Sequence, residues 1–272
     1  MRDMVADQVL PPLPRNYAGV NWLGFWTLYM REVRRFAKIS MQTIIAPVMT
    51  SLLYMLIFSV ATNGARPPVH GIPFVQFVAP GLVMMTILNN AFANSSSSIL
   101  QAKMMGLSGD FLTPPLTSIE QTLGFILGAA TRGVVVGVVT AVCVWPFANS
   151  HVAHFWAIAY YMVAASMLMA EIGVLGGLWS EKFDHLAMVT NFVVMPLTFL
   201  SGTFYMVNRL PQPFSTISQF NPFFYLIDGF RYGFIGVADG NLTIGLVWTF
   251  LLVTTLLAWC WWLFWKGYRL KT

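Results

Sequence analysis

The sequence predicts an all-α membrane protein with six transmembrane helices, and two observations carry the prediction. The chain of 272 residues is 57% hydrophobic and only 9% charged, with a mean hydropathy of +0.67. Soluble proteins carry roughly 25% charged residues, so this composition favours a bilayer. Apolar runs of about 20 residues, the length that crosses a membrane, also recur between short polar turns. Six such runs use up the chain and leave no room for a catalytic domain.

The expected spans cover residues 39–61, 74–100, 121–147, 154–180, 186–202 and 243–265. Pro47 should kink the first, and the short fifth contains Pro196. The second carries asparagines and the serine run 95–98 in its later half. Because such side chains are poor neighbours for lipid, they should face another helix or a water-filled path, and we favour hydrogen bonding between helices.

The N-terminal region divides into a polar, Pro-rich tail at 1–19 and an amphipathic helix at 20–38. The tail has no apolar segment of the kind found in signal peptides. Trp22 and Trp26 recur on one face of the helix, and Arg31, Arg34 and Arg35 on another. We therefore expect this helix to lie in the membrane interface. Nucleic-acid binding is disfavoured because the aromatic residues are not interleaved with the basic ones.

The segment 203–240 is too polar and broken to span a membrane, yet unusually aromatic. It predicts one or two short helices that enter the outer leaflet without crossing and pack against protein. With six spans, both termini share one side of the membrane. Most basic residues then fall on that side, which makes it cytoplasmic: Arg2, Arg15, Arg31, Arg34, Arg35, Lys38, Lys103, Lys182, Lys266, Arg269 and Lys271, against Arg66, Arg209 and Arg231 opposite.

A polar stretch at 104–120 separates the second and third spans. Pro114 and Pro115 end any helix there, so the sequence before them predicts a short helical elbow. Phe111 and Leu112 would project as an apolar knob, and Asp110 with Lys103 would form a polar rim, a shape suited to docking on another protein. A simple solvated loop remains the alternative. The residues expected to take part are Lys103, Leu107, Asp110, Phe111, Leu112, Thr113 and Pro114.

Two charges fall well inside the spans, Arg132 in the third and Glu171 in the fourth. Their depths differ by roughly 5 Å, a gap that an arginine side chain can cover. Since an isolated charge in a bilayer costs at least about 2.5 kcal/mol, we expect them to pair or to line a wet cavity together. Snorkelling of Glu171 toward the inner surface remains open.

The sequence contains no recognisable catalytic or cofactor motif. GxxxxGK[ST], HExxH, GxSxG and CxxC patterns are all missing. His151 and His154 lack a third ligand, so we expect no metal site. Cys143 and Cys260 lie in different spans and should be free thiols. We therefore expect neither an enzyme nor a bound cofactor.

Five sequence blocks in order resemble the membrane subunit of ABC exporters of the type-two permease family, found in bacterial inner membranes. The blocks are FVAPGLVMMTILNNAFANSSSSI at 77–99, DFLTPPLTS at 110–118, GGLWSEKFDHL at 176–186, PLTFLSGTFYMVNRLP at 196–211 and FNPFFYLIDGFRYGFIG at 220–236. The resemblance makes 20–272 the permease domain. It implies a connecting helix at the N-terminus, a coupling helix in 104–116 and re-entrant helices in 203–240. One departure is Asp110-Phe111-Leu112, where the family often has Glu-Leu-Leu.

The resemblance also implies an assembly of two permease and two separate ATP-hydrolysing subunits, with ATP and magnesium bound by the partner. The function expected is outward transport of a lipid, a glycan or a drug-like amphipath through a homodimer. The candidates for the dimer seam and path are Asn89, Asn90, Asn94, Thr198, Ser201 and Phe204. An ion-coupled or energy-independent carrier or channel is the alternative, and a lipid-modifying membrane enzyme is a third possibility. The sequence leaves the substrate open.

Overall fold

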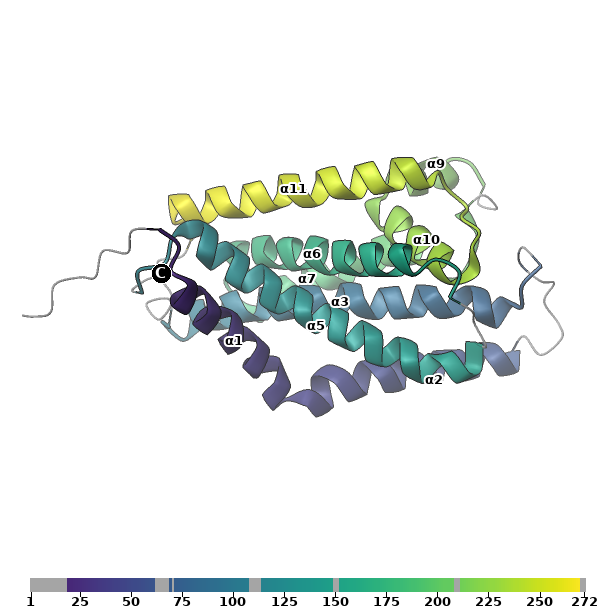
Figure 1. Ribbon diagram of the computed structural model, residues 1–272, viewed down its shortest axis with the longest axis horizontal. Helices are drawn as coiled ribbons and strands as arrows, with labels where there is room; N and C mark the ends of the chain where they lie inside the picture. The colour runs from purple at the N-terminus through teal and green to yellow at the C-terminus, as the bar shows by residue number, and fades with distance from the viewer. Residues whose placement is uncertain are drawn as a thin grey trace, which may run out of the picture.

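The chain folds into a bundle of helices that run along a common axis (Figure 1). The computed structural model describes residues 19–61, 69, 71–107, 114–148, 152–207 and 211–269. Its helices are α1 (Trp22–Lys38), α2 (Ala46–Ala61), α3 (Phe74–Met104), α5 (Ser118–Ala148), α6 (Phe155–Trp179), α7 (Phe183–Val189), α8 (Met195–Leu200), α9 (Phe214–Phe220), α10 (Pro222–Ile235) and α11 (Leu242–Lys266).

Six helical segments among the described residues are long and apolar enough to cross a membrane, as predicted. Five of them are Met41–Ala61, α3, α5, α6 and α11, and the remaining one joins α7 and α8 as Phe183–Leu200. The predicted N-terminal helix is α1, and the predicted short helices before the last span are α9 and α10. The described ends of the chain, at α1 and after α11, lie at the same end of the bundle (Figure 1).

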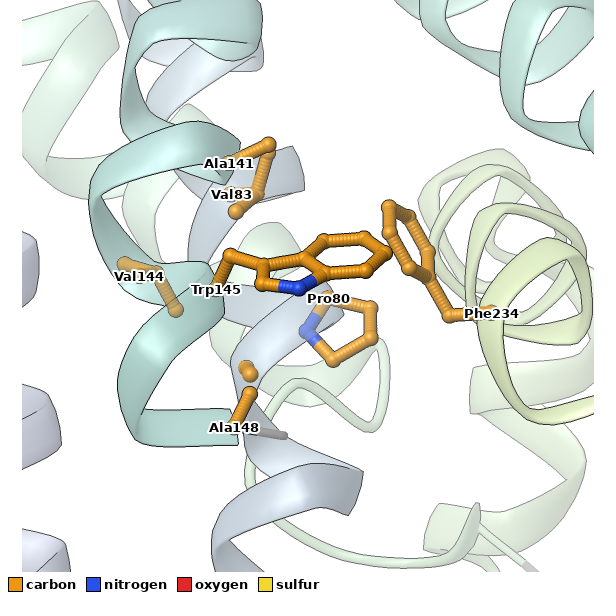
Figure 2. Close-up of a pocket in the computed structure, with 8 residues that line it drawn as sticks. Pro80, Val83, Ala141, Val144, Trp145, Ala148 and Phe234 are labelled. Carbon is orange, nitrogen blue, oxygen red and sulfur yellow. The ribbon is translucent and has the colours of Figure 1, made fainter. Parts of the chain in front are cut away.

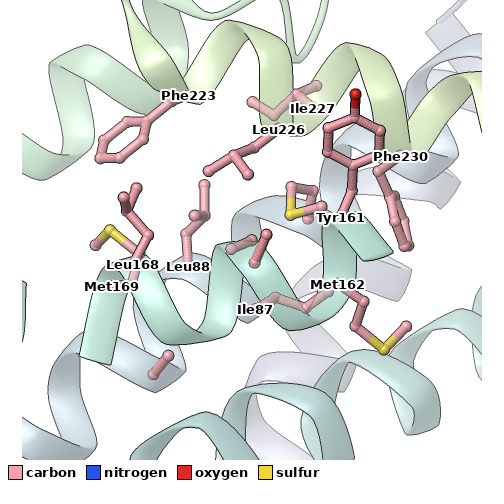
Figure 3. Close-up of a cluster of buried hydrophobic side chains, with 14 of the residues drawn as sticks. Ile87, Leu88, Tyr161, Met162, Leu168, Met169, Phe223, Leu226, Ile227 and Phe230 are labelled. Atoms are coloured by element: carbon pink, nitrogen blue, oxygen red, sulfur yellow. The ribbon is translucent and has the colours of Figure 1, made fainter. Parts of the chain in front are cut away.

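Helix α3 is the centre of the bundle. In its most apolar part 83% of the residues are buried, against 11% in α11, which lies along one side (Figure 1). Side chains from α3, α6 and α10 meet in the largest apolar cluster, where Leu88, Leu168 and Leu226 converge (Figure 3). A second cluster near the α1 end joins α1, α5, α6 and α11, and contains the stacked rings of Phe125 and Phe264.

Helices α3 and α6 approach closely because glycines on α6 face serines on α3. A Cβ on Gly173 would lie 2.6 Å from the carbonyl oxygen of Phe92 and would also clash with Ser95. A Cβ on Gly177 would lie 2.9 Å from the carbonyl oxygen of Ser96. The prediction that the serines face a helix is therefore right. Ser95 and Ser96, however, donate to carbonyls of their own helix, four residues back, and not across to α6.

Two sparsely buried spans, Met41–Ala61 and Phe183–Leu200, each have a π-helical stretch just before a proline. The stretch Met41–Ile45 precedes Pro47, and the stretch Thr190–Val194 precedes Pro196. A proline ring clashes with the carbonyl four residues back in an α-helix. A wider turn, bonded five residues back, displaces that carbonyl. The expected irregularity at Pro47 is thus present as a widened turn.

Substituting Gly173 with alanine should destabilise the protein because its new methyl group meets the α3 backbone. We expect a loss of about 1–3 kcal/mol, typical of an overpacked core, seen as a lower midpoint of thermal unfolding in detergent. Gly176→Ala is the matched control, because a Cβ there would meet its nearest neighbours only at 3.6 Å. Equal stability of the two variants would contradict the close approach of α3 and α6.

Candidate functional site

The start of α1 is tied to the residues that follow the 104–120 turn. The Asn21 amide donates to Glu120 Oε1 at 2.6 Å, and the Thr117 amide donates to Glu120 Oε2 at 2.7 Å. The Asn21 side chain donates to the Pro115 carbonyl at 3.2 Å. A single buried carboxylate therefore joins the first turns of α1 and α5. Our sequence reasoning missed Glu120, although Thr117 followed three residues later by glutamate is the pattern of a capping box.

Lys103 closes the end of α6 and does not form a free polar rim. Its ammonium group donates to the carbonyls of Leu178 and Ser180, both at 2.7 Å, and to that of Gly177 at 3.3 Å. The last carbonyls of a helix lack partners within the helix, so a cation there is stabilising. Because Lys103 is only 7% exposed, the predicted rim role is wrong for this residue.

Only part of the predicted docking loop is described. Asp110, Phe111, Leu112 and Thr113 lie outside the described residues, so their roles stay predictions. On either side of them, Leu107 is exposed and Pro114 is half-buried.

Helix α1 packs against α5 with a face that we did not predict. Leu28, Glu32 and Phe36 are buried, and the first two lie over Gly124 and Gly128 of α5. Phe36 lies four residues after Glu32, which puts it on the same buried stripe. Of the residues predicted to mark the interfacial helix, Trp22, Trp26, Arg31 and Arg34 are exposed and Arg35 is half-buried.

Glu32 connects the basic stripe of α1 to α3. It forms ion pairs with Arg31 at 3.2 Å and Arg35 at 3.3 Å, and accepts a hydrogen bond from Ser98 at 2.9 Å. Arg35 also donates to the Asn94 carbonyl at 2.6 Å and to its side-chain oxygen at 3.1 Å. The sequence signal for Glu32 was its position as the one acid among basic residues on an amphipathic helix.

The predicted pair of Arg132 and Glu171 does not form. Arg132 donates to the side-chain oxygen of Asn90 on α3 at 2.9 Å, whereas both Glu171 carboxylate oxygens are buried without a hydrogen-bond partner. The two residues have similar depths but different neighbours. The backbone carbonyl of Glu171 accepts from the Cys260 thiol of α11, at 3.6 Å. The sequence gives the depth of each residue in the membrane, but depth alone does not determine on which face of the helix the side chain lies.

Most of the predicted seam lies inside the single chain. The buried members are Asn90, Asn94, Thr198 and Ser201. The end of α8 packs against the start of α10, where the Asn221 side chain donates to Ser201 Oγ and to the Leu197 carbonyl, both at 2.8 Å. Thr198 and Ser201 are 0% and 1% exposed in the single chain, so neither side chain lies on a surface that a second copy could contact. Asn89 and Phe204 remain partly exposed.

A buried arginine fixes α10 against α3. Arg231 donates to the Gly202 carbonyl at 2.6 Å, lies 3.9 Å from the centre of the Phe77 ring and is 3.9 Å from Asp239. Asp228 in turn accepts from the Asp239 and Gly240 amides. We had counted Arg231 among basic residues at the outer surface, but it is only 2% exposed. It connects α10 to the Gly202 carbonyl and to the Phe77 ring of α3 instead.

Two hollows differ in chemistry and size. Trp145 of α5 lies between Pro80 of α3 and Phe234 of α10 in an apolar groove with room for about 20 Å³, close to one water molecule (Figure 2). A larger cavity of about 360 Å³, lined by both apolar and polar side chains, lies between α2, α3 and Met195 of α8, and Asn89 and Asn90 form part of its wall. Only the second is within the range of ligand sites, about 300–1,000 Å³.

No metal cluster occurs among the residues that the structure describes. His154 stacks on Tyr232 with ring centres 4.5 Å apart, which explains its position without a ligand. His151 lies outside the described residues. Cys143 and Cys260 are free, in different helices.

The family model for the ABC-2 type transporter matches residues 24–235. The chain belongs to this family. It is 35% identical to the inner membrane transport permease YadH of Escherichia coli (strain K12), over 92% of this chain and 98% of the relative. It is 23% identical to nodulation protein J of Rhizobium leguminosarum bv. viciae, over 88% of this chain and 93% of that one. As an ABC-2 family member with six apolar helices, it is a multi-pass membrane transport component.

Replacing Lys103 with methionine should lower stability because it removes the cation that caps α6. Hydrogen bonds to charged groups contribute about 1.5–3 kcal/mol, and we expect a loss in that range in the thermal unfolding of the purified chain. Lys182→Met, which removes an exposed charge just beyond α6, is the control. If both variants unfolded together, Lys103 would be free to act as the rim residue first predicted.

Proposed function

We propose that this chain is the permease subunit of an exporter that moves a lipid, a glycan or an amphipathic, drug-like substrate outward, powered by a separate ATP-hydrolysing subunit. Family membership over most of the chain is the observation that carries the proposal. The sequence contains no phosphate loop of the GxxxxGK[ST] type, so ATP and magnesium are assigned to the partner.

In the proposed assembly, two copies of this chain form a homodimer and bind two copies of the ATPase. The chain lies in the bacterial inner membrane with both termini in the cytoplasm. The excess of basic residues on the side of the termini supports this orientation. The printed name of the relative YadH, an inner membrane permease, supports the location.

The ATPase docks, in this proposal, on the 104–116 turn. Both flanks of the turn are held by the bundle: Lys103 binds the end of α6, and Glu120 binds the start of α1. A loop carried on fixed flanks transmits a push from a partner better than a free loop would. The exposed Trp22 and Trp26 of α1 support an interfacial position for that helix. The short α9 and α10 are assigned as the outer re-entrant pair.

Phe111→Asp and Leu112→Asp should prevent assembly with the ATPase. If the two side chains are apolar anchors in a groove, an unpaired buried charge there costs a few kcal/mol of association. We expect loss of co-purification with a co-expressed partner ATPase, and loss of ATP-dependent transport.

Val152→Asp is the matched control, since Val152 is an exposed apolar residue between the end of α5 and the start of α6, far along the bundle from the end of α3 where the turn begins. Such exposed substitutions change stability by less than about 0.5 kcal/mol. Normal assembly and transport in both loop variants, with each inserted in the membrane, would remove the docking role. Transport that persists without ATP would favour the carrier alternative.

A further inference from the structure

The larger cavity, between α2, α3 and α8, combines apolar lining with a group of polar side chains. Thr50 and Ser51 of α2 and Thr86 and Asn89 of α3 line it, with the Ser51 and Thr86 hydroxyl groups 3.0 Å apart, and Gln42 also lines it. These residues are all in helical segments apolar enough to span a membrane. Polar side chains at such depth line a water-filled space or a polar ligand.

An uncompensated positive charge lies directly behind this wall. Arg132 reaches Asn90, a wall residue, with one hydrogen bond of 2.9 Å, and its Nε is buried without a partner. No carboxylate among the described residues forms an ion pair with Arg132. Its position, 14 residues after the start of the 31-residue α5, is near the middle of that helix. A cation at that depth requires a counter-charge or water.

The groups around Arg132 supply further hydrogen-bond donors, but no carboxylate that is free to form an ion pair with it. Arg35 lies within Coulombic range of it, and the two like charges repel. The Glu32 carboxylate already binds Arg31 and Arg35 of its own helix and accepts a hydrogen bond from Ser98. The side-chain nitrogen of Asn94, whose side-chain oxygen accepts from Arg35, is buried without a partner. The region behind the cavity therefore has unused donors and excess positive charge.

We propose that this cavity binds the acidic headgroup, a phosphate or a carboxylate, of an amphipathic substrate, with Arg132 as its counter-charge. An anionic oxygen accepts strong hydrogen bonds from guanidinium groups, and a sugar hydroxyl cannot supply the missing charge. The apolar part of the ligand would contact Pro47, Leu82 and Met85, which complete the wall. The inference rests on the proposed export function and specifies its substrate class.

Native mass spectrometry of the purified full chain, in a neutral glycoside detergent, tests the site without the ATPase. The probes are 1-oleoyl lysophosphatidic acid, 1-oleoyl lysophosphatidylcholine with the same chain, and inorganic phosphate. We expect the acidic lysolipid to bind about tenfold more tightly than the zwitterionic one, and Arg132→Gln to abolish the difference. Arg132→Lys, which keeps the charge, should retain part of it.

Arg269→Gln is the charge-matched control, since Arg269 lies beyond α11 at the end of the bundle and should leave binding unchanged. Equal binding of the acidic lysolipid by the native chain and Arg132→Gln would overturn the proposal. If Arg132→Gln does not fold, Asn89→Leu, at a partly exposed wall position, must lower acidic binding several-fold, and unchanged binding would overturn it. Inorganic phosphate that binds as tightly as the lysolipid would refute the amphipath and identify a small free anion.

The ATPase-docking proposal and the acidic-headgroup proposal can be refuted independently of each other. Lysolipid binding needs neither the 104–116 turn nor the partner, whereas co-purification of the ATPase does not depend on the cavity. Loss of charge selectivity with normal ATPase assembly would therefore remove only the acidic substrate class.

Discussion

The close approach of α3 and α6 is the constraint on which the rest of the bundle depends. Two membrane helices gain no hydrophobic energy by leaving lipid for each other, so contact must come from packing. Gly173 and Gly177 permit that contact, with no side chain between the two backbones. The arrangement positions both functional regions. At one end it brings Lys103 to the last carbonyls of α6, and halfway along it turns Asn89 and Asn90 away from α6, toward α2 and α5.

Features that depend on composition and period could be predicted from the sequence. The six spans, the N-terminal helix and the short helices after the fifth span follow from runs of apolar residues and from breaks in them. The partners of individual side chains could not be predicted. Arg132 and Glu171 have matching depths, but the rotation of α5 and α6 about their axes decides what each one meets. Ser201 looks like a seam residue in sequence, because its partner Asn221 lies 20 residues later, in a segment whose short helices could be predicted but not placed.

Buried ionic groups connect the helices where the sequence suggested separate surface charges. Glu32 binds two arginines of α1 and a serine of α3. Arg231, on α10, donates to a carbonyl of the loop after α8 and lies over a ring of α3. Removing one partner of such a network leaves a charge without compensation, which is more costly than never having built it. Both networks therefore fix geometry: one sets the angle of α1 against the bundle, and the other sets the outer segment.

The two widened turns before Pro47 and Pro196 have a mechanical consequence. Both occur in the sparsely packed helical segments that bound the larger cavity, and Pro47 and Met195 are themselves wall residues. A proline has no amide proton, so each segment already lacks a main-chain hydrogen bond at this place. Bending there is easier than bending the densely packed α3, whose main chain is held against α6. Two of the segments that bound the cavity can therefore bend more easily than α3. The width of the cavity can change while α3 stays packed against α6.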